Sequence, residues 1–493
     1  MAATVSTHPF EEQFLLTELE DTPACQYLIR YLKELKASAI LFEPHYVDRH
    51  FIDDYAHYYA RAFAPPDPWC CRLHFFAETS AAELDALLDD FYEGGSDRRS
   101  EVQARLQAGY LGYVVVRPLS DARLGRTVLK PWDSEKRRRY EAVREYRAHV
   151  AGVELRVQGL AFQQQDRGVA ACASIALWSA LQQVAKLDGH RTPTPSAVTM
   201  AARSPYPPTY GLTGDQMANA LATLGYVAES FGPENPALFR AKLASCLRSH
   251  LPVILWVGSD DGAGGHAVTV TGFSEPATVV RIDLDAKTGF KMRDGSVDVI
   301  YVHDDNLGSH AHYELISRKN DKGEPWVYLQ RGNRKRPQVD WWNIDELPII
   351  AAVVPKPPKL RLPIENLILD IVELGQEIDK MVGADKVDFT ARFAAGVRYR
   401  EELLAVQPML SGSRTFHQSL SLPRFVGVVS VNLNGRHLFD AILDVTELSR
   451  KPRQPSVLAL AAHGVPTRSR LHKKLQALAD FFECPAAFGP IAP

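Results

Sequence analysis

The sequence predicts an α+β protein built of three consecutive regions, residues 1–150, 151–358 and 359–493. The chain has 493 residues, which is too long for one ordinary domain and suggests about three. Helical and strand-like hydrophobic patterns occur together along it. A proline-rich stretch, VVPKPPKLRLP at 353–363, is typical of a linker and marks the second boundary.

Composition and charge narrow the class of protein. The apolar fraction suits a soluble globular chain, and a formal net charge of −3 does not point to nucleic acid or an anionic membrane as a partner. The first residues do not form a secretory signal, and no apolar run is long enough to span a bilayer. The six cysteines are scattered and include no Cys-x-x-Cys pair. This pattern favours free thiols in a reducing cytoplasm and argues against a thiolate zinc site.

The N-terminal region is expected to mix helices and strands. The pattern predicts helices at 24–36, 81–92 and 134–147, and strands at 39–43, 71–76 and 111–119. The helix at 134–147 is inferred from its charge-rich sequence, SEKRRRYEAVREYR, which suits a solvated helix face better than a phosphate-binding surface.

The middle and C-terminal regions are also expected to mix both element types. In the middle region we expect strands at 153–165, 226–230, 252–258, 266–273 and 296–305, and helices after Cys172 and at 214–225 and 236–249. In the C-terminal region we expect helices at 363–382, 388–404 and 466–482, and strands at 424–433 and 438–448.

The stretch QQQDRGVAACASIALWSAL, 163–181, places Cys172 in the first turns of an apolar helix. Helix N-termini carry unpaired N–H groups and a partial positive charge, which stabilise a thiolate, the reactive form of cysteine. A free cysteine beside alanines on an apolar helix is also a common core residue. The local sequence therefore permits a nucleophile at Cys172 without requiring one.

Two later motifs supply the partners that a nucleophilic cysteine needs. His266 starts the apolar strand HAVTVTGF after a glycine-rich loop, and Asp304 and Asp305 end the strand SVDVIYVHDD. An imidazole can take the thiol proton, and a carboxylate can hold the imidazole in the correct tautomer. Alone, each motif also fits a surface histidine or an ordinary strand-end turn. Their occurrence in the order Cys, His, Asp favours a catalytic site.

In this order and spacing, residues 155–315 resemble papain-like cysteine peptidases, closest to the bacterial branch that includes bacteriocin-leader peptidases. The matching segments are QDRGVAACASIALW, GLTGDQMANALATLGY, HLPVILWVG, GHAVTVTGF and VIYVHDDNLG. The resemblance implies a catalytic helix packed on an antiparallel sheet, flanked here by two further α+β regions. It also implies hydrolysis of a peptide or isopeptide bond, with Cys172 as nucleophile, His266 as base and an aspartate that orients the histidine.

The sequence departs from this family in three places. The oxyanion glutamine of the family precedes its cysteine by six positions, where this chain has Asp166; we assign the role to Gln165, with Gln164 as an alternative. The nucleophile lies in Ala-Cys-Ala where that branch often has Asp-Cys-Gly. Asp304 and Asp305 both fit the position of the acid. Because neighbouring strand residues point to opposite faces, only one should face His266.

Other sites and functions were weighed against this one. The stretch VHDDNLGSHAH collects the metal-type ligands His303, Asp304, Asp305, His310 and His312, but no matching remote motif accompanies it. His45 and His50 lack the zincin spacing and are expected to be unrelated surface histidines. The sequence carries neither a dinucleotide fingerprint nor a P-loop, so we expect neither cofactor nor metal.

The expected function is that of a regulated bacterial intracellular protease whose partner is a polypeptide substrate or another protein. Two alternatives remain open. One is a non-catalytic binding module that keeps the papain-like fold, and the other is an acyltransferase that uses the same triad.

Overall fold

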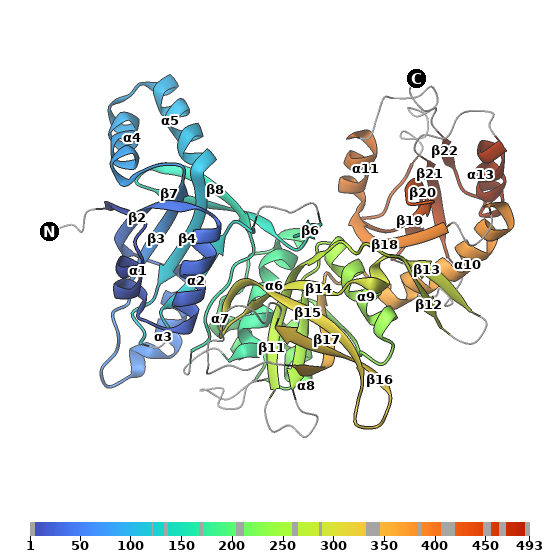
Figure 1. Ribbon diagram of the computed structural model, residues 1–493, viewed down its shortest axis with the longest axis horizontal. Coiled ribbons are helices and arrows are strands. Elements are labelled where there is room, and N and C mark those ends of the chain that lie inside the picture. The colour runs from blue at the N-terminus through green and yellow to red at the C-terminus, as the bar shows by residue number, and fades with distance from the viewer. Residues whose placement is uncertain are drawn as a thin grey trace.

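The computed structural model describes residues 5–120, 122–132, 137–166, 171–203, 212–258, 265–284, 288–331, 346–382, 387–405, 420–446, 455–462 and 470–488. Figure 1 shows three parts in a row: the N-terminal region in blue, the middle region in green and yellow, and the C-terminal region in orange and red. Several sheets and helices are mixed throughout, which confirms the predicted α+β class.

The N-terminal region contains a five-stranded antiparallel sheet, in which the spatial order β1-β2-β3-β4-β5 is also the order in the sequence. The strands are β1 (Ser6–Pro9), β2 (Ala37–Tyr46), β3 (Cys70–Ala77), β4 (Tyr110–Val116) and β5 (Leu124–Leu129). The helices are α1 (Glu12–Leu19), α2 (Pro23–Glu34), α3 (Arg49–His57), α4 (Ala81–Glu93) and α5 (Ser96–Gly109), with a short 3₁₀ helix, η1 (Tyr59–Arg61).

Apolar residues cover both faces of this sheet, because successive strand residues point to opposite sides. On β2, Ile40 joins the apolar cluster of α1 and α2, whereas Leu41 joins the cluster that includes α4 and α5. The second cluster continues into the middle and C-terminal regions. The three regions therefore share one continuous apolar core.

The helix predicted at 134–147 is wrong for the part that the structure describes. Residues 137–147 contain β6 (Arg138–Arg139) and the start of β7 (Arg144–Val150), which forms a hairpin with β8 (Val153–Gly159). In β7 every second residue from Tyr146 onward is buried, and the residues between are exposed. This period of two is a strand pattern, and the charged residues on the exposed face concealed it. Residues 134–136 lie outside the described residues.

The middle region is a closed antiparallel barrel with helices packed against it. The strands are β10 (Val253–Gly258), β11 (Gly265–Ser274), β14 (Val299–Asp304), β15 (Gly308–Lys319), β16 (Pro325–Arg331) and β17 (Leu347–Lys356). Each pairs with the next, and β10 also pairs with β17, which closes the path. β9 (Val227–Phe231) adds to β17, and β6 adds to β11.

The longest helix of the middle region, α6 (Cys172–Asp188), lies against β11. Thr269 on β11 is fully buried, and its Oγ1 donates a hydrogen bond to the carbonyl oxygen of Ala176 at 2.9 Å. The remaining helices of this region are α7 (Pro195–Ala201), α8 (Gly214–Thr223) and α9 (Pro236–Arg248). The contact between α6 and β11 fixes the start of the helix beside the start of the strand.

The C-terminal region is built on a seven-stranded sheet in the order β12-β13-β18-β19-β20-β21-β22. The strands are β12 (Val280–Asp283), β13 (Gly289–Met292), β18 (Val387–Ala395), β19 (Phe425–Leu433), β20 (Arg436–Asp444), β21 (Val457–Ala462) and β22 (Ala486–Phe488). The helices are α10 (Ile364–Val382), α11 (Gly396–Ala405) and α13 (Arg470–Phe481). The hairpin β12–β13 precedes the predicted boundary at 358, yet it extends the sheet that follows this boundary.

The helix predicted at 388–404 is wrong over its first half. β18 occupies Val387–Ala395, and only Gly396–Ala405 is helical, as α11. Phe389, Ala391 and Phe393 are buried and alternate with partly exposed residues. This alternation indicates a strand, and the helix prediction fails because the pattern of the following helix continues into this segment without a break in composition.

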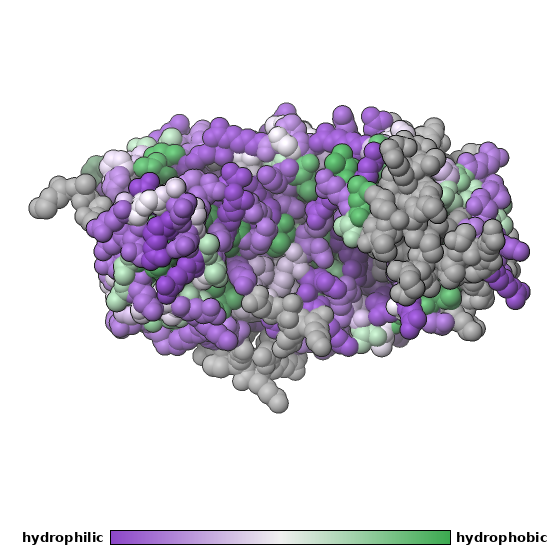
Figure 2. Space-filling view, turned by 90° about the horizontal axis from the view of Figure 1, so that it is seen from above, coloured by the Kyte–Doolittle hydropathy of each residue, from purple (hydrophilic) through white to green (hydrophobic). Residues whose placement is uncertain are grey.

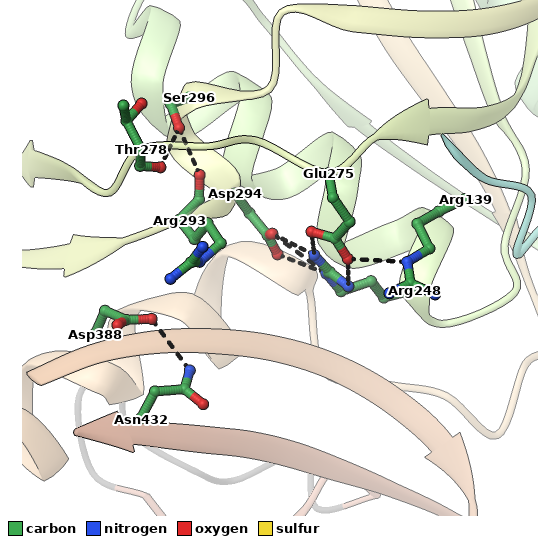
Figure 3. A network of polar contacts seen from close by, with 9 residues as sticks. All are labelled: Arg139, Arg248, Glu275, Thr278, Arg293, Asp294, Ser296, Asp388 and Asn432. Carbon is green, nitrogen blue, oxygen red and sulfur yellow. Dashed lines mark hydrogen bonds and ion pairs between the residues drawn. The ribbon is translucent and has the colours of Figure 1, made fainter. Parts of the chain in front are cut away.

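A partly buried ion network connects the barrel to the hairpin β12–β13 (Figure 3). Arg248, at the end of α9, donates from Nη2 to Glu275 Oε2, just after β11, and to Asp294 Oδ1, just after β13, each at 2.8 Å. Asp294 begins the 3₁₀ helix η2 (Asp294–Ser296) and is fully buried. The network holds the hairpin at a fixed position relative to α9.

The face of the molecule in Figure 2 is mostly hydrophilic, with hydrophobic residues in small separate patches. Among the described residues, no helix has the length and apolar character needed to cross a membrane.

Candidate active site

Cys172 is the first residue of α6. The residues that follow it, Ala173 to Ala185, are all buried, whereas Cys172 itself is half-buried at the N-terminal end of the helix. The N-cap residue Ala171 has an extended backbone, and its side chain does not cap the helix. The first N–H groups of a helix without a side-chain cap are available to an anion. The Cys172 thiol therefore lies at the positive end of the helix dipole.

His266 is the second residue of β11 and bridges the cysteine and an acid. Its Nε2 lies 3.0 Å from Asp304 Oδ1, and its ring also shares a hydrogen bond with Cys172. Because Nε2 faces the carboxylate, Nδ1 is the ring nitrogen left for the thiol. Residues from three separate elements, α6, β11 and β14, thus form one chain of contacts from Cys172 to Asp304.

The sheet register explains why the histidine and the acid meet. β11 and β14 are antiparallel neighbours, and Thr269 pairs with His303. The start of β11 therefore lies beside the end of β14, where Asp304 is the last residue. The side chain of Asp304 is fully buried.

Two further donors hold the Asp304 carboxylate in place. The Tyr313 hydroxyl donates to Oδ2 at 2.5 Å, and the backbone N–H of Asn306 donates to Oδ1 at 3.1 Å. Burial alone would raise the pKa of Asp304, but the charge and hydrogen bond of His266, together with these donors, lower it. Asp304 is consequently held as an anion.

The same ion pair acts on the histidine. Burial alone would lower the pKa of His266, but the charge and hydrogen bond of Asp304, followed by the contact with Cys172, raise it well above its usual value. This electrostatic balance favours the imidazolium form of His266.

Asp305 also approaches the imidazole, so the expectation that only one aspartate would face His266 is wrong. Its Oδ1 lies 3.5 Å from His266 Nε2. Strand β14 ends at Asp304, and Asp305 lies in the turn that follows, where the alternation of strand faces no longer applies. Burial, together with the charge of Asp304, raises the pKa of Asp305 to about 7.

The glutamines before the cysteine take different partners. Gln165 donates from Nε2 to Asn306 Oδ1 at 2.7 Å, which links it to the turn after Asp304. The side chain of Gln164 accepts a hydrogen bond from the backbone N–H of Leu124 on β5 at 3.3 Å. Gln165 therefore adjoins the site, whereas Gln164 is tied to the N-terminal sheet. The oxyanion role of Gln165 stays a prediction.

Asp166, at the position where the family has its glutamine, is buried and paired with Arg117. The distance from Arg117 Nη1 to Asp166 Oδ2 is 3.1 Å, and both side chains are almost inaccessible to solvent. This ion pair gives Asp166 a structural role, which accounts for an acidic residue at that position.

The residues weighed as metal ligands largely have other partners. His303 Nε2 bonds to the carbonyl oxygen of Leu160, and the backbone N–H of His310 donates to His303 Nδ1. His310 Nδ1 pairs with Thr271 Oγ1 at 2.8 Å. Within the described ranges, the group with the spacing of metal ligands is His266, Asp304 and Asp305, which does not include His303, His310 or His312.

The expectation of two surface histidines is confirmed for His45 and wrong for His50. His45 is exposed, but His50 is buried and accepts a hydrogen bond at Nδ1 from Trp178 Nε1 of α6 at 3.0 Å. The sequence contained no signal for this contact, because the two residues lie 128 positions apart.

Sequence reasoning also missed Tyr313 and Tyr27. Tyr313 lies on β15 and holds Asp304, and Tyr27 on α2 donates to the carbonyl oxygen of Ser309 at 2.9 Å. The alternating pattern of 308–319 could have predicted the strand that carries Tyr313, but not the residue that it contacts.

No protein-family model matches the chain, and no curated protein matches it either.

Proposed function

We propose that this protein is a cysteine-dependent hydrolase with a papain-like fold that cleaves a peptide or isopeptide bond. The observation that carries the proposal is the unbroken contact from Cys172 through His266 to Asp304, with the cysteine at a helix N-terminus. A catalytic helix packed against a closed antiparallel barrel supports the papain-like fold.

The chemistry follows from the roles that these groups can take. His266 accepts the thiol proton, and the sulfur of Cys172 attacks the carbonyl carbon of the scissile amide. Asp304 orients the imidazole and stabilises its positive charge. Backbone N–H groups at the start of α6, with the amide of Gln165, are assigned to the oxyanion.

The intermediate then collapses. The C–N bond breaks, and His266 gives its proton to the departing amine, which leaves an acyl thioester on Cys172. Water, deprotonated by His266, attacks the thioester and releases the carboxylic acid and the thiol. An amine in place of water would make the same site an acyltransferase.

The test is selective alkylation of the intact protein with iodoacetamide near neutral pH, followed by peptide mapping. Cys172 should be labelled much faster than Cys71 and Cys484, which are also half-buried and serve as internal controls. Burial raises the pKa of Cys484 to about 11, so this thiol should react slowly.

His266→Ala should slow the labelling at position 172, and Cys172→Ser should abolish it there without changing the other cysteines. Labelling of Cys172 no faster than of Cys484 would contradict the proposal and favour the non-catalytic binding module. If a reactive Cys172 transferred its acyl group to an added amine, the product would instead identify an acyltransferase.

A further inference from the structure

We propose that Asn306 is a positioning residue, which orients the Gln165 side chain so that this side chain donates to the oxyanion formed when Cys172 attacks. The proposal rests on the proposed function, to which the oxyanion role of Gln165 belongs. Asn306 lies in the turn after β14, two residues beyond Asp304. Its side chain bonds to Gln165, whereas its backbone bonds to Asp304. It thereby links the glutamine to the acid of the site.

The backbone around Gln165 is held on both sides by the N-terminal region. The N–H of Gln164 donates to the carbonyl oxygen of Leu124 at 2.9 Å, and the carbonyl oxygen of Gln164 accepts from Arg117 Nη2 at 2.9 Å. On the other side, the Asp166 carboxylate is paired with Arg117. These contacts fix the backbone on either side of Gln165, so the direction of its side-chain amide is what remains to be set.

The Gln165 amide has a donor end and an acceptor end, and only the donor end can stabilise an oxyanion. Nε2 carries two hydrogens, whereas Oε1 carries none. Nε2 donates one hydrogen to Asn306 Oδ1 at 2.7 Å, and within the described residues the second is left for a ligand. Without Asn306, the amide could rotate and present Oε1, which would repel the negative oxygen of the intermediate. The acceptor on Asn306 therefore selects the useful orientation.

Asn306 is itself fixed by its backbone to the acid of the site. Its N–H donates to Asp304 Oδ1 at 3.1 Å, and the same oxygen lies 3.0 Å from His266 Nε2. The turn is closed by the N–H of Leu307, which donates to the carbonyl oxygen of Asp304 at 2.9 Å. Because the bond to Asp304 comes from the backbone, a substitution at Asn306 removes the contact with Gln165 and leaves this bond in place.

The other end of the Asn306 amide gives a second reason to assign it a role. Nδ2 is almost inaccessible to solvent and has no hydrogen-bond acceptor among the described residues. Buried donors in native proteins are usually paired, and an unpaired one calls for an explanation. The contact of Oδ1 with Gln165 Nε2 accounts for this orientation, because the reverse one would bring two donors together.

The test compares two reactions of Cys172 in the intact protein. Iodoacetamide alkylates the sulfur by displacing iodide from a tetrahedral carbon, so no oxyanion forms. With p-nitrophenyl acetate the sulfur attacks the carbonyl carbon, an oxyanion forms, and the C–O bond breaks to release p-nitrophenolate, which leaves an acetyl thioester. Release by Cys172→Ala is subtracted, and peptide mapping locates the acetyl group. The ratio of the two rates separates stabilisation of the oxyanion from the reactivity of the thiol.

The variants should affect acetylation and spare alkylation. Gln165→Ala should slow acetylation about 10²-fold or more, since it removes a donor to the oxyanion. Asn306→Ala should slow it about tenfold to a hundredfold, because the donor stays but is misplaced. The double variant should lose no more than Gln165→Ala, because Asn306 acts through Gln165. The matched control is Asn432→Ala on β19, which removes a hydrogen bond from Nδ2 to Asp388 Oδ1 at 3.1 Å (Figure 3) and should react as the wild type does.

The other outcomes are equally defined. If Asn306→Ala slowed both reactions equally, Asn306 would serve the turn and Asp304, and the proposal would be overturned. It would also be overturned if Asn306→Ala or Gln165→Ala were acetylated at the wild-type rate, or if the double variant lost the product of the two single losses. In each case, fast alkylation of the wild type would leave the proposed hydrolase standing. A wild type whose Cys172 alkylates no faster than Cys484 would instead defeat the proposed hydrolase, and this proposal with it.

Discussion

Replacing Gly308 by alanine tests whether the N-terminal region supports the turn that follows Asp304. A Cβ atom at Gly308 would lie 2.3 Å from the Tyr27 ring, against 3.4–4 Å for an ordinary contact, so the ring must move by about 1 Å. That shift would disturb the hydrogen bond from the Tyr27 hydroxyl to the carbonyl oxygen of Ser309. The turn and α2 would then lose their close packing.

The expected cost of Gly308→Ala has two parts. Overpacking against a ring held by a hydrogen bond costs about 1–3 kcal/mol. The backbone of Gly308 has φ +157°, where side chains are strained, and this adds about 1–3 kcal/mol. We therefore expect the free energy of unfolding to fall by about 2–6 kcal/mol in total.

Equilibrium unfolding in guanidinium chloride separates the two parts. Gly323→Ala is the matched control, because Gly323 has φ +80° but open space around it, so alanine there pays the backbone strain alone. In a Tyr27→Ala background, Gly308→Ala should also cost only the strain. The reasoning fails if Gly308→Ala costs no more than Gly323→Ala, or if its cost is unchanged when Tyr27 is removed.

Three other changes have defined outcomes. Tyr313→Phe removes the donor to Asp304 Oδ2 and should lower the free energy of unfolding in guanidinium by about 1.5–3 kcal/mol, while Cys172 labels more slowly; unaltered stability would show that the hydroxyl is not needed. Burial lowers the pKa of His50 from 6.5 to about 3, so the folded protein binds fewer protons than the unfolded chain between these values, and stability is lost as pH falls through this window. At pH 5 the histidine has cost the wild type about 2 kcal/mol of its free energy of unfolding. Between pH 7 and pH 5, the free energy of unfolding of His50→Gln should therefore fall by about 2 kcal/mol less than that of the wild type. Arg248→Met leaves buried Asp294 without its bidentate partner and should cost about 3–5 kcal/mol by the same assay, most of which Asp294→Asn in the same chain should recover.

The positions of Cys172, His266 and Asp304 were predictable because each depends on local pattern. A glycine-containing turn followed by an apolar run predicts the start of a helix, and α6 does begin at Cys172. Apolar strands that end or begin in polar turns predict where His266 and Asp304 lie on their elements. Antiparallel neighbours then bring the start of one strand beside the end of another.

Other features depend on contacts that no local pattern encodes. The hairpin β12–β13 joins a sheet whose next strand, β18, lies about a hundred residues later in the chain, through the pairing of Met292 with Phe389. The hydrogen bond of Tyr27 joins residues 282 positions apart. The prediction that only one of Asp304 and Asp305 faces His266 failed for a different reason. It assumes that side chains alternate between two faces along a continuous strand, but β14 ends between the two residues.

The turn after β14 shows why the flanking regions matter to the candidate site. The turn and the residues that flank it are held by Tyr27 from α2, which bonds Ser309, by Tyr313 from β15, which bonds Asp304, and by Gln165, which bonds Asn306. The first of these contacts comes from outside the predicted region 151–358. Without α2, the carbonyl oxygen of Ser309 would lose its hydrogen bond from Tyr27, and Gly308 would lose the Tyr27 ring that packs on it. The barrel strands could still pair. The orientation of the acid, and hence of the imidazole, would then depend on fewer contacts. Because catalytic groups must be held closely in place, the N-terminal region is expected to act as a structural part of the site, beyond any role in choosing partners.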